Sequence, residues 1–372
     1  MIESYRVAVI QAEKIPPRVG GDKKFKENVQ KNIDRYCALI DYTFSGPFAM
    51  LRQGPGRVRL VTFGEYSLTG LHHAAEPGQK VLSKKEIIEK VAIRMPGPET
   101  DFFAAKAKQY DTYVALSNLE YDPEWPDYFF NSGIIISPRG KIILKYRKTV
   151  TNVPIAMHTS VHDIMDKYKN PISKKYDPFP VVDTEIGRLA VMICGDIVAP
   201  EIPRVYSIQG AEVVLHLTSG QSTSGGGNRP LFVTEASIRT RAYDNCVYFV
   251  HANWGPELEA YYPRARISGG SNVFDYLGNE LARADDTNEQ IVIAAIDIEA
   301  CRKYREQYFK NYCTVIRTEL YAPFYNKPIY PANTFLKYGP VDELMSEKQR
   351  GYFKQAMDNF KKQANYYSEN DV

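Results

Sequence analysis

Three residues that could carry out hydrolytic chemistry each stand at the end of an apolar run in this sequence. They are Glu65, Lys148 and Cys194. Apolar runs bounded by polar and turn residues, such as 189–193 before the cysteine, predict short buried strands. Because α/β folds place chemistry just beyond the ends of buried strands, we expect these three side chains to form one site if the strand ends converge.

The chemistry of such a group is coherent. A free thiol is mostly protonated at neutral pH, so the Glu65 carboxylate could take the proton of Cys194 while the Lys148 ammonium stabilises the thiolate. Lys148 and the backbone N–H of Gly195 could also stabilise an oxyanion formed on a carbonyl group. Taken singly, the residues are also compatible with a core cysteine and with solvated charges at strand ends.

The elements that must position these residues alternate between strands and helices, with hairpins that add antiparallel strands. This order predicts a layered α/β fold with a mixed sheet in each of two halves. The predicted strands are 5–10, 57–63, 113–117, 131–137, 141–146, 189–193, 211–217, 247–250, 271–274 and 290–297, and the predicted helices are 25–42, 101–110, 202–209 and 234–245.

Two domain-scale units follow from this pattern. Residues 1–300 are expected to form the hydrolase domain, and residues 301–372 a C-terminal extension. The extension contains a Tyr/Pro-rich part, 321–338, which is expected to be extended, and a charged helix at about 341–367. A long polar connection, 149–180, is expected together with the extension to shape either the pocket mouth or a subunit contact.

Composition narrows the class of protein. The 372 residues include 47 basic and 44 acidic side chains, for a net charge of +3, so no strong field for nucleic acid or an anionic membrane is expected. No secretory signal precedes the first strand, and no apolar stretch approaches the length of a membrane span. Five scattered cysteines favour reduced thiols, so the expected location is the cytoplasm.

Several motifs resemble those of the nitrilase superfamily of carbon–nitrogen hydrolases. They are VTFGEYSLTG around Glu65, GKIILKYRK ending at Lys148, and ICGD around Cys194, followed by Pro200-Glu201. The resemblance extends in collinear order over residues 5–298. It implies a four-layer αββα sandwich with two mixed sheets, a catalytic triad on Glu65, Lys148 and Cys194, and no metal or organic cofactor. It also implies a homodimer or higher homo-oligomer.

The sequence departs from the family pattern at three places. Gly64 stands where members commonly have proline, and no second glutamate follows Lys148 within 149–160. The candidates to substitute for that glutamate are Asp163, Asp166 and His158. The sequence Cys-Gly-Asp at the nucleophile, in place of the Cys-Trp-Glu of true nitrilases, resembles the amidase and carbamoylase branches.

The resemblance therefore favours hydrolysis of a small linear amide or N-carbamoyl compound through a Cys194 thioester. Three alternatives stay open: a nitrilase at the same site, a transferase that passes the thioester to an amine, and a catalytically silent binding or assembly protein. The expected substrate-binding residues are Tyr66, Gly195, Asp196, Tyr128 and Trp254, although the aromatic ones could equally be packing residues. The run from His158 to Asp163 could be read as metal ligands, but it lacks a third well-spaced set, and no metal site is expected.

Overall fold

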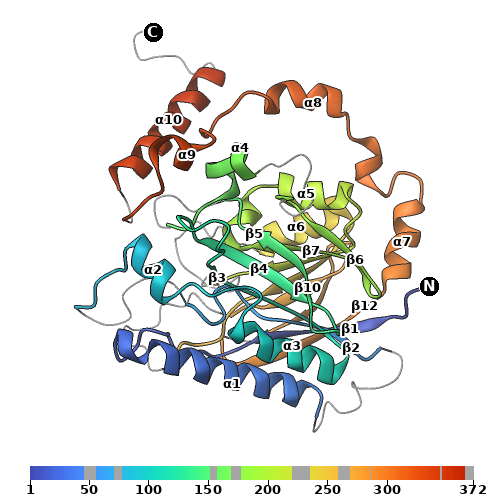
Figure 1. Ribbon diagram of the computed structural model, residues 1–372. Helices are drawn as coiled ribbons and strands as arrows, with labels where there is room; N and C mark the ends of the chain where they lie inside the picture. The colour runs from blue at the N-terminus through green and yellow to red at the C-terminus, as the bar shows by residue number, and fades with distance from the viewer. Residues whose placement is uncertain are drawn as a thin grey trace.

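Figure 1 shows two β-sheets that pack face to face, with helices on their outer sides. The computed structural model describes residues 1–45, 56–70, 78–150, 157–168, 177–219, 235–258, 269–285, 287–343 and 346–364. Each sheet has six strands, in the orders β12-β1-β2-β3-β4-β5 and β11-β10-β9-β8-β7-β6. The predicted αββα sandwich with two mixed sheets is confirmed.

Both sheets have the same topology: three parallel strands form the centre, and antiparallel strands pair with them on both sides. In the first sheet β1, β2 and β3 are parallel, and in the second β7, β8 and β9 are parallel. The strands of the first sheet are β1 Tyr5–Gln11, β2 Val58–Thr62, β3 Tyr113–Glu120, β4 Phe130–Ile136, β5 Ile142–Arg147 and β12 Gln290–Ile296. Those of the second sheet are β6 Val181–Thr184, β7 Gly187–Ile193, β8 Val213–Leu217, β9 Tyr248–Ala252, β10 Asn272–Phe274 and β11 Glu280–Arg283.

The sheets approach each other closely where small residues allow it. A Cβ added to Gly133 of β4 would lie 2.6 Å from Val191 of β7, so only glycine fits at this point of the interface. By the two-residue period of a strand, the odd-numbered residues 189–193 of β7 face the first sheet. Val191 and Ile193 therefore pack between the two sheets, next to the point where β7 ends at Cys194.

Amphipathic helices cover the outer faces. Helices α1 Phe25–Thr43 and α3 Pro98–Tyr110 bury Ile33, Tyr36 and Phe103 against the first sheet. Helices α5 Glu201–Ile208 and α6 Glu235–Asn245 pack on the second sheet through residues of the other apolar cluster. Two short helices that the sequence analysis did not predict, α2 Lys84–Lys90 and α4 Met165–Tyr168, lie in connections.

The predicted boundary at residue 300 falls inside a helix. Helix α7, Ile298–Glu306, belongs to the folded body, because Cys301 is fully buried in the core and Arg302 forms an ion pair with Glu212 at 2.6 Å. Arg305 donates to the carbonyl of Cys246 at 2.8 Å. The body therefore continues to the end of α7.

Beyond α7 the chain arches over α5 and returns to the 157–168 segment (Figure 1). The expectation of an extended segment at 321–338 is wrong, because α8 Thr318–Tyr325 and α9 Thr334–Tyr338 lie there. Pro323 is tolerated in the two-turn α8 because it removes only one helical hydrogen bond. The charged helix is present as α10, Glu347–Gln363. Among the described residues, no helix has the length and apolarity needed to cross a membrane.

Candidate active site

The three predicted catalytic residues converge. Glu65 lies beyond β2, Lys148 directly beyond β5 and Cys194 directly beyond β7. The Nζ atom of Lys148 donates to Oε1 of Glu65 at 3.0 Å, and both side chains are buried. The charges of Glu65 and Lys148 both act on the Cys194 thiol. Strand ends from the two sheets therefore meet at one polar site inside the sandwich.

Glu65 is held at both carboxylate oxygens and at its backbone. Oε1 accepts from Nδ2 of Asn131 at 2.6 Å, and Oε2 accepts from the Ser219 hydroxyl at 2.6 Å. Its backbone N–H donates to the carbonyl of Thr218 at 2.9 Å, and the indole N–H of Trp254 donates to its carbonyl. Contacts from both sheets therefore fix the orientation of this carboxylate.

Gly64 explains one departure from the family pattern. A Cβ at this position would lie 2.7 Å from the Thr218 carbonyl oxygen and 2.8 Å from Cδ1 of Trp254. Real Cβ atoms essentially never approach so closely, so a proline or alanine would displace the end of β8 or the indole. Glycine at 64 is what lets the second sheet contact the backbone of Glu65.

Electrostatics at the site favour a neutral thiol beside a buried ion pair. Burial by itself lowers the pKa of Lys148, but the charges of Glu65 and Cys194 outweigh burial and hold that pKa above its ordinary value. Burial and the Glu65 carboxylate raise the pKa of Cys194 to about 11, and the Lys148 ammonium only partly offsets this. At neutral pH the thiol therefore keeps its proton until a base removes it.

The backbone presents Cys194 in an uncommon conformation. Its φ of 44° lies in the left-handed region, which non-glycine residues rarely adopt, and its side chain is partly exposed. Such strain persists only where surrounding contacts hold it, and it is frequent at active sites. The 3₁₀ helix Cys194–Val198 begins at the same point, so its first N–H groups have no partner within the helix.

Asp196 connects the turn at Cys194 to the residues on either side of Lys148 by hydrogen bonds. Its Oδ2 accepts from the Tyr146 hydroxyl at 2.7 Å and from the N–H of Ile193 at 2.9 Å. Its Oδ1 accepts from the N–H of Val150 at 2.8 Å and from the Thr149 hydroxyl at 3.3 Å. The buried carboxylate thus sets the distance between the ends of β5 and β7.

Comparison with known proteins identifies the family. A family model described as carbon-nitrogen hydrolase matches residues 6–306. The chain belongs to the carbon–nitrogen hydrolase family. The match ends where α7 ends, which agrees with the extent of the folded body.

Curated relatives of this chain include formamidases. The formamidases of Bacillus cereus (strain B4264) and Bacillus anthracis are each 30% identical to it over 254 residues. These matches cover 68% of this chain and 61% of each formamidase, so the chain spans about three fifths of the length of those relatives.

Solved structures show the same fold. Nit3 of Saccharomyces cerevisiae, a nitrilase superfamily member, has a TM-score of 0.58 at 21% identity and covers 82% of this chain and 94% of its own. A cysteine-to-serine mutant of the amidase from Nesterenkonia AN1 has a TM-score of 0.58 at 17% identity, covering 86% and 97%. A glutamate-to-glutamine mutant of that amidase carries the acetamide moiety of fluoroacetamide covalently at its active-site cysteine.

The expected substrate-binding residues divide into two groups by their position relative to the triad. Tyr66 is buried with a φ of 52°, and its hydroxyl lies within electrostatic range of Glu65, Lys148 and Cys194. Gly195 is buried directly after the nucleophile. These two residues lie at the triad.

The remaining three make other contacts. Asp196 uses both oxygens on protein donors, as described above, and Trp254 uses its indole N–H on the Glu65 carbonyl. Tyr128 packs against Trp125, with ring centroids 6.0 Å apart, and Lys167 lies over its ring. Tyr128 and Trp254 thus make contacts within the protein, and their role in substrate binding stays a prediction.

The candidates for a second acid lie in the described part of the connection, away from the hydrogen bonds of Glu65 and Lys148. Asp163 accepts from the Thr334 hydroxyl at 2.7 Å and from the N–H of Ser160 at 3.0 Å, and Asp166 is exposed. His158 is buried in the same segment. Part of the connection, 151–156 and 169–176, lies outside the described residues, and within the described ones no three His, Cys, Asp or Glu side chains form a metal-binding group.

Two polar partners of Glu65 were missed by the sequence analysis. Asn131 stands one position inside β4, and its backbone carbonyl accepts from the N–H of Lys148 at 2.9 Å. Ser219 follows β8. The available signal was the rule that already selected Glu65 and Cys194, because Asn131 and Ser219 also lie at or near ends of buried strands.

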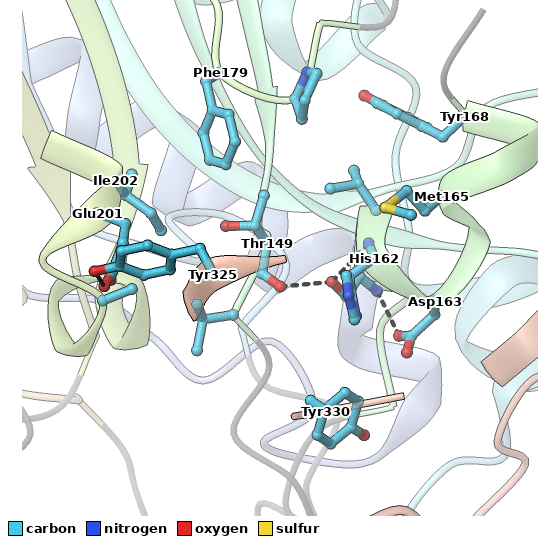
Figure 2. Close-up of a pocket in the computed structure, with 15 residues that line it drawn as sticks. Thr149, His162, Asp163, Met165, Tyr168, Phe179, Glu201, Ile202, Tyr325 and Tyr330 are labelled. Atoms are coloured by element: carbon cyan, nitrogen blue, oxygen red, sulfur yellow. Dashed lines mark hydrogen bonds between the residues drawn. The ribbon is translucent and has the colours of Figure 1, made fainter. Parts of the chain in front are cut away.

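A cavity of about 830 Å³ lies between the connection, α5 and the extension, and none of the triad residues lines it. Its wall includes Thr149 and Val150, which follow Lys148, and Glu201 at the start of α5. Figure 2 shows Tyr325 of α8 beside Glu201, whose Oε1 accepts from the Tyr325 hydroxyl at 2.9 Å. The extension therefore lines this cavity through Tyr325 and Tyr330 without supplying a residue to the triad.

Proposed function

We propose that this protein hydrolyses the C–N bond of a small linear amide through a thioester on Cys194. The observation that carries the proposal is the buried Glu65–Lys148 pair, 3.0 Å apart, acting on a partly exposed thiol at a strained strand end. The 30% identity to formamidases makes a short aliphatic amide the first substrate to test, with N-carbamoyl compounds next.

The reaction needs one base that changes role. Cys194 Sγ bonds to the carbonyl carbon as Glu65 takes the thiol proton, and Lys148 with the Gly195 N–H stabilises the oxyanion. Glu65 then gives that proton to the leaving nitrogen, which departs as ammonia or an amine and leaves the thioester. Water attacks the thioester with Glu65 again as base, which releases the acid and restores the thiol.

Substrate contacts fall to Tyr66 and Gly195, and positioning to the other two residues near the triad. Burial and the charge of Glu65 raise the pKa of Tyr66, so its hydroxyl stays a neutral donor. Asp196 and Trp254 act through Lys148, Cys194 and Glu65, because their polar atoms are engaged with the protein. Tyr128 acts by packing.

The proposal is tested by ammonia release over aliphatic amides, aromatic amides, N-carbamoyl amino acids and nitriles. Wild type, Cys194→Ala and Cys37→Ala are compared, because Cys37 is a partly exposed thiol far from the triad. Release from an amide that disappears only in Cys194→Ala is expected. Release from nitriles alone would favour the nitrilase alternative, and no release with an unreactive Cys194 would favour a silent homologue.

We also propose that the protein is a cytoplasmic homo-oligomer. All five cysteines carry free thiols, as a reducing compartment requires. Helix α8 has no buried residue, and Leu320 and Phe324 are 66% and 73% exposed. Apolar side chains gathered on one short helix favour a contact with a second copy, and light scattering after size exclusion measures it.

A further inference from the structure

Two buried histidines stand side by side behind the nucleophile. His216 of β8 and His251 of β9 are directly paired across the parallel strands, and neither is accessible to solvent. Their side chains point to the face that α6 covers, because Phe274 pairs with Phe249 on that face and Arg239 of α6 lies 5.1 Å from the Phe274 ring. The two histidines therefore lie on the outer face of the second sheet, the face that does not contact the first sheet.

Hydrogen bonds connect His251 to His216 and His216 to the backbone carbonyl of Cys194. Nε2 of His216 lies 2.9 Å from the carbonyl oxygen of Cys194, and Nδ1 of His251 lies 3.0 Å from Nδ1 of His216. A carbonyl oxygen only accepts, so Nε2 of His216 carries the hydrogen and its Nδ1 is the acceptor. His251 must then donate from Nδ1, which fixes both tautomers.

The two histidines have these tautomers only while both rings are neutral. Burial lowers the pKa of His216 to about 4, and burial together with His216 lowers that of His251 well below its ordinary value. A protonated His216 would donate from both nitrogens, so His251 would have to accept at Nδ1 and carry its hydrogen on Nε2, the opposite tautomer. At neutral pH the pair therefore holds one arrangement.

That arrangement fixes the peptide plane between Cys194 and Gly195. The carbonyl of Cys194 and the N–H of Gly195 belong to one planar trans unit, so they point in opposite directions. His216 holds the carbonyl toward the α6 face, and the Gly195 N–H must then point away from it. The strained φ of 44° at Cys194 makes such an anchor necessary.

We propose that His216 and His251 are positioning residues that lock the Cys194–Gly195 peptide with its N–H directed toward the oxyanion. The proposal rests on the hydrolytic function proposed above. His216 contacts the peptide, and His251 acts through His216 by fixing its tautomer. Loss of the lock lets the peptide rotate, which removes one oxyanion donor while leaving the thiol, Glu65 and Lys148 in place.

The kinetic test compares His216→Leu, His216→Gln and Val214→Ala. Removing one oxyanion donor costs about 10²–10³ in kcat, so His216→Leu is expected to lose that factor with little change in KM. His216→Gln keeps a donor for the carbonyl and should recover most of the rate. Val214→Ala lies on the same face of β8 and controls for lost packing, so it should lower the Tm and leave kcat unchanged.

Nitrogen NMR of the wild-type imidazoles tests the lock without any variant. A protonated Nε2 on His216 and a protonated Nδ1 on His251 are expected at pH 7. The opposite tautomers, a His216→Leu enzyme with wild-type kcat, or a His216→Gln enzyme as slow as His216→Leu would each overturn the proposal. A wild type that hydrolyses no amide yet shows the expected tautomers would refute the hydrolytic function and leave the lock supported.

Discussion

The triad and helix α8 differ in which side chains they bury: the triad buries charged groups, and α8 exposes apolar ones. At the triad, Glu65 and Lys148 are charged groups buried between two sheets, where the Glu65 carboxylate accepts hydrogen bonds from Lys148, Asn131 and Ser219. On α8 the reverse holds, since Leu320 and Phe324 are apolar side chains left in solvent. Buried charges are retained at an energetic cost, whereas exposed apolar side chains suit association.

This contrast teaches which substitutions should affect chemistry. Around the triad, contacts cross from one sheet to the other, so a small change at one strand end moves groups on another. In the extension, the described contacts to the body are spread along the segment, from the Lys310 carbonyl, which accepts from the Cys246 thiol, through the Tyr325 hydroxyl on Glu201 to the Thr334 hydroxyl on Asp163. None of these groups belongs to the triad. Changes there should alter assembly or the neighbouring cavity more than the reaction.

The largest effect is expected from Glu65→Gln. Losing the base should reduce kcat/KM by about 10²–10⁴. It also leaves the Lys148 ammonium buried without its partner, which costs about 3–5 kcal/mol in the free energy of unfolding. Activity assays and urea unfolding measure the two effects, and Glu65→Gln with Lys148→Met should regain stability without regaining activity. A stable, active Glu65→Gln enzyme would contradict the role of the pair.

Glycine-to-alanine changes compare the two regions with the same added methyl group. Gly64→Ala should displace Glu65, since the new Cβ meets the Thr218 carbonyl, and a displacement of about 1 Å costs about 10²-fold in rate. Gly351→Ala in α10 meets no atom and should raise the free energy of unfolding by about 0.5–1 kcal/mol without changing kcat. Equal activities for the two variants would show that the close contact at Gly64 has no catalytic importance.

The pH dependence of Cys194 alkylation tests the electrostatics of the triad. Because burial and Glu65 raise the pKa of the thiol to about 11, the thiolate fraction should rise about tenfold per pH unit between pH 7 and 10. The iodoacetamide rate constant should follow that rise, and Lys148→Met should lower it further, because Lys148 stabilises the thiolate. A rate that is already constant between pH 7 and 8 would mean that the thiolate is preformed.

The smallest catalytic effect is expected on α8. Leu320→Ser with Phe324→Ser removes exposed apolar groups, and surface changes usually stay within about 0.5 kcal/mol of the wild-type stability. The rate should be unchanged, while light scattering should show a smaller assembly if α8 contacts a second copy. An unchanged assembly would remove the support that α8 gives to the proposed oligomer.

The sequence predicted the positions of the triad because each member follows an apolar strand, and strand ends in α/β folds meet. The sandwich followed from alternating strands and helices together with the family resemblance. The polar partners of Glu65 were not predicted: Asn131 and Ser219 lie near strand ends like the triad, but which strand ends meet at Glu65 depends on how distant strands pack. The helices at 318–325 and 334–338 were not predicted, because tyrosine and proline give these segments a low helix propensity. Tertiary contacts such as the Thr334–Asp163 hydrogen bond stabilise the second helix, and these contacts cannot be read from the local sequence.

The central claim is that one thiol, Cys194, forms the covalent intermediate. Iodoacetamide carries an amide group and alkylates thiols, so its labelling can be followed by peptide mass spectrometry alongside residual amide hydrolysis. One label per chain on the Cys194 peptide, formed in step with the loss of activity and slowed by substrate, is the expected result. Full activity in a protein labelled at Cys194, or inactivation that follows labelling of Cys37 or Cys313 instead, would contradict it.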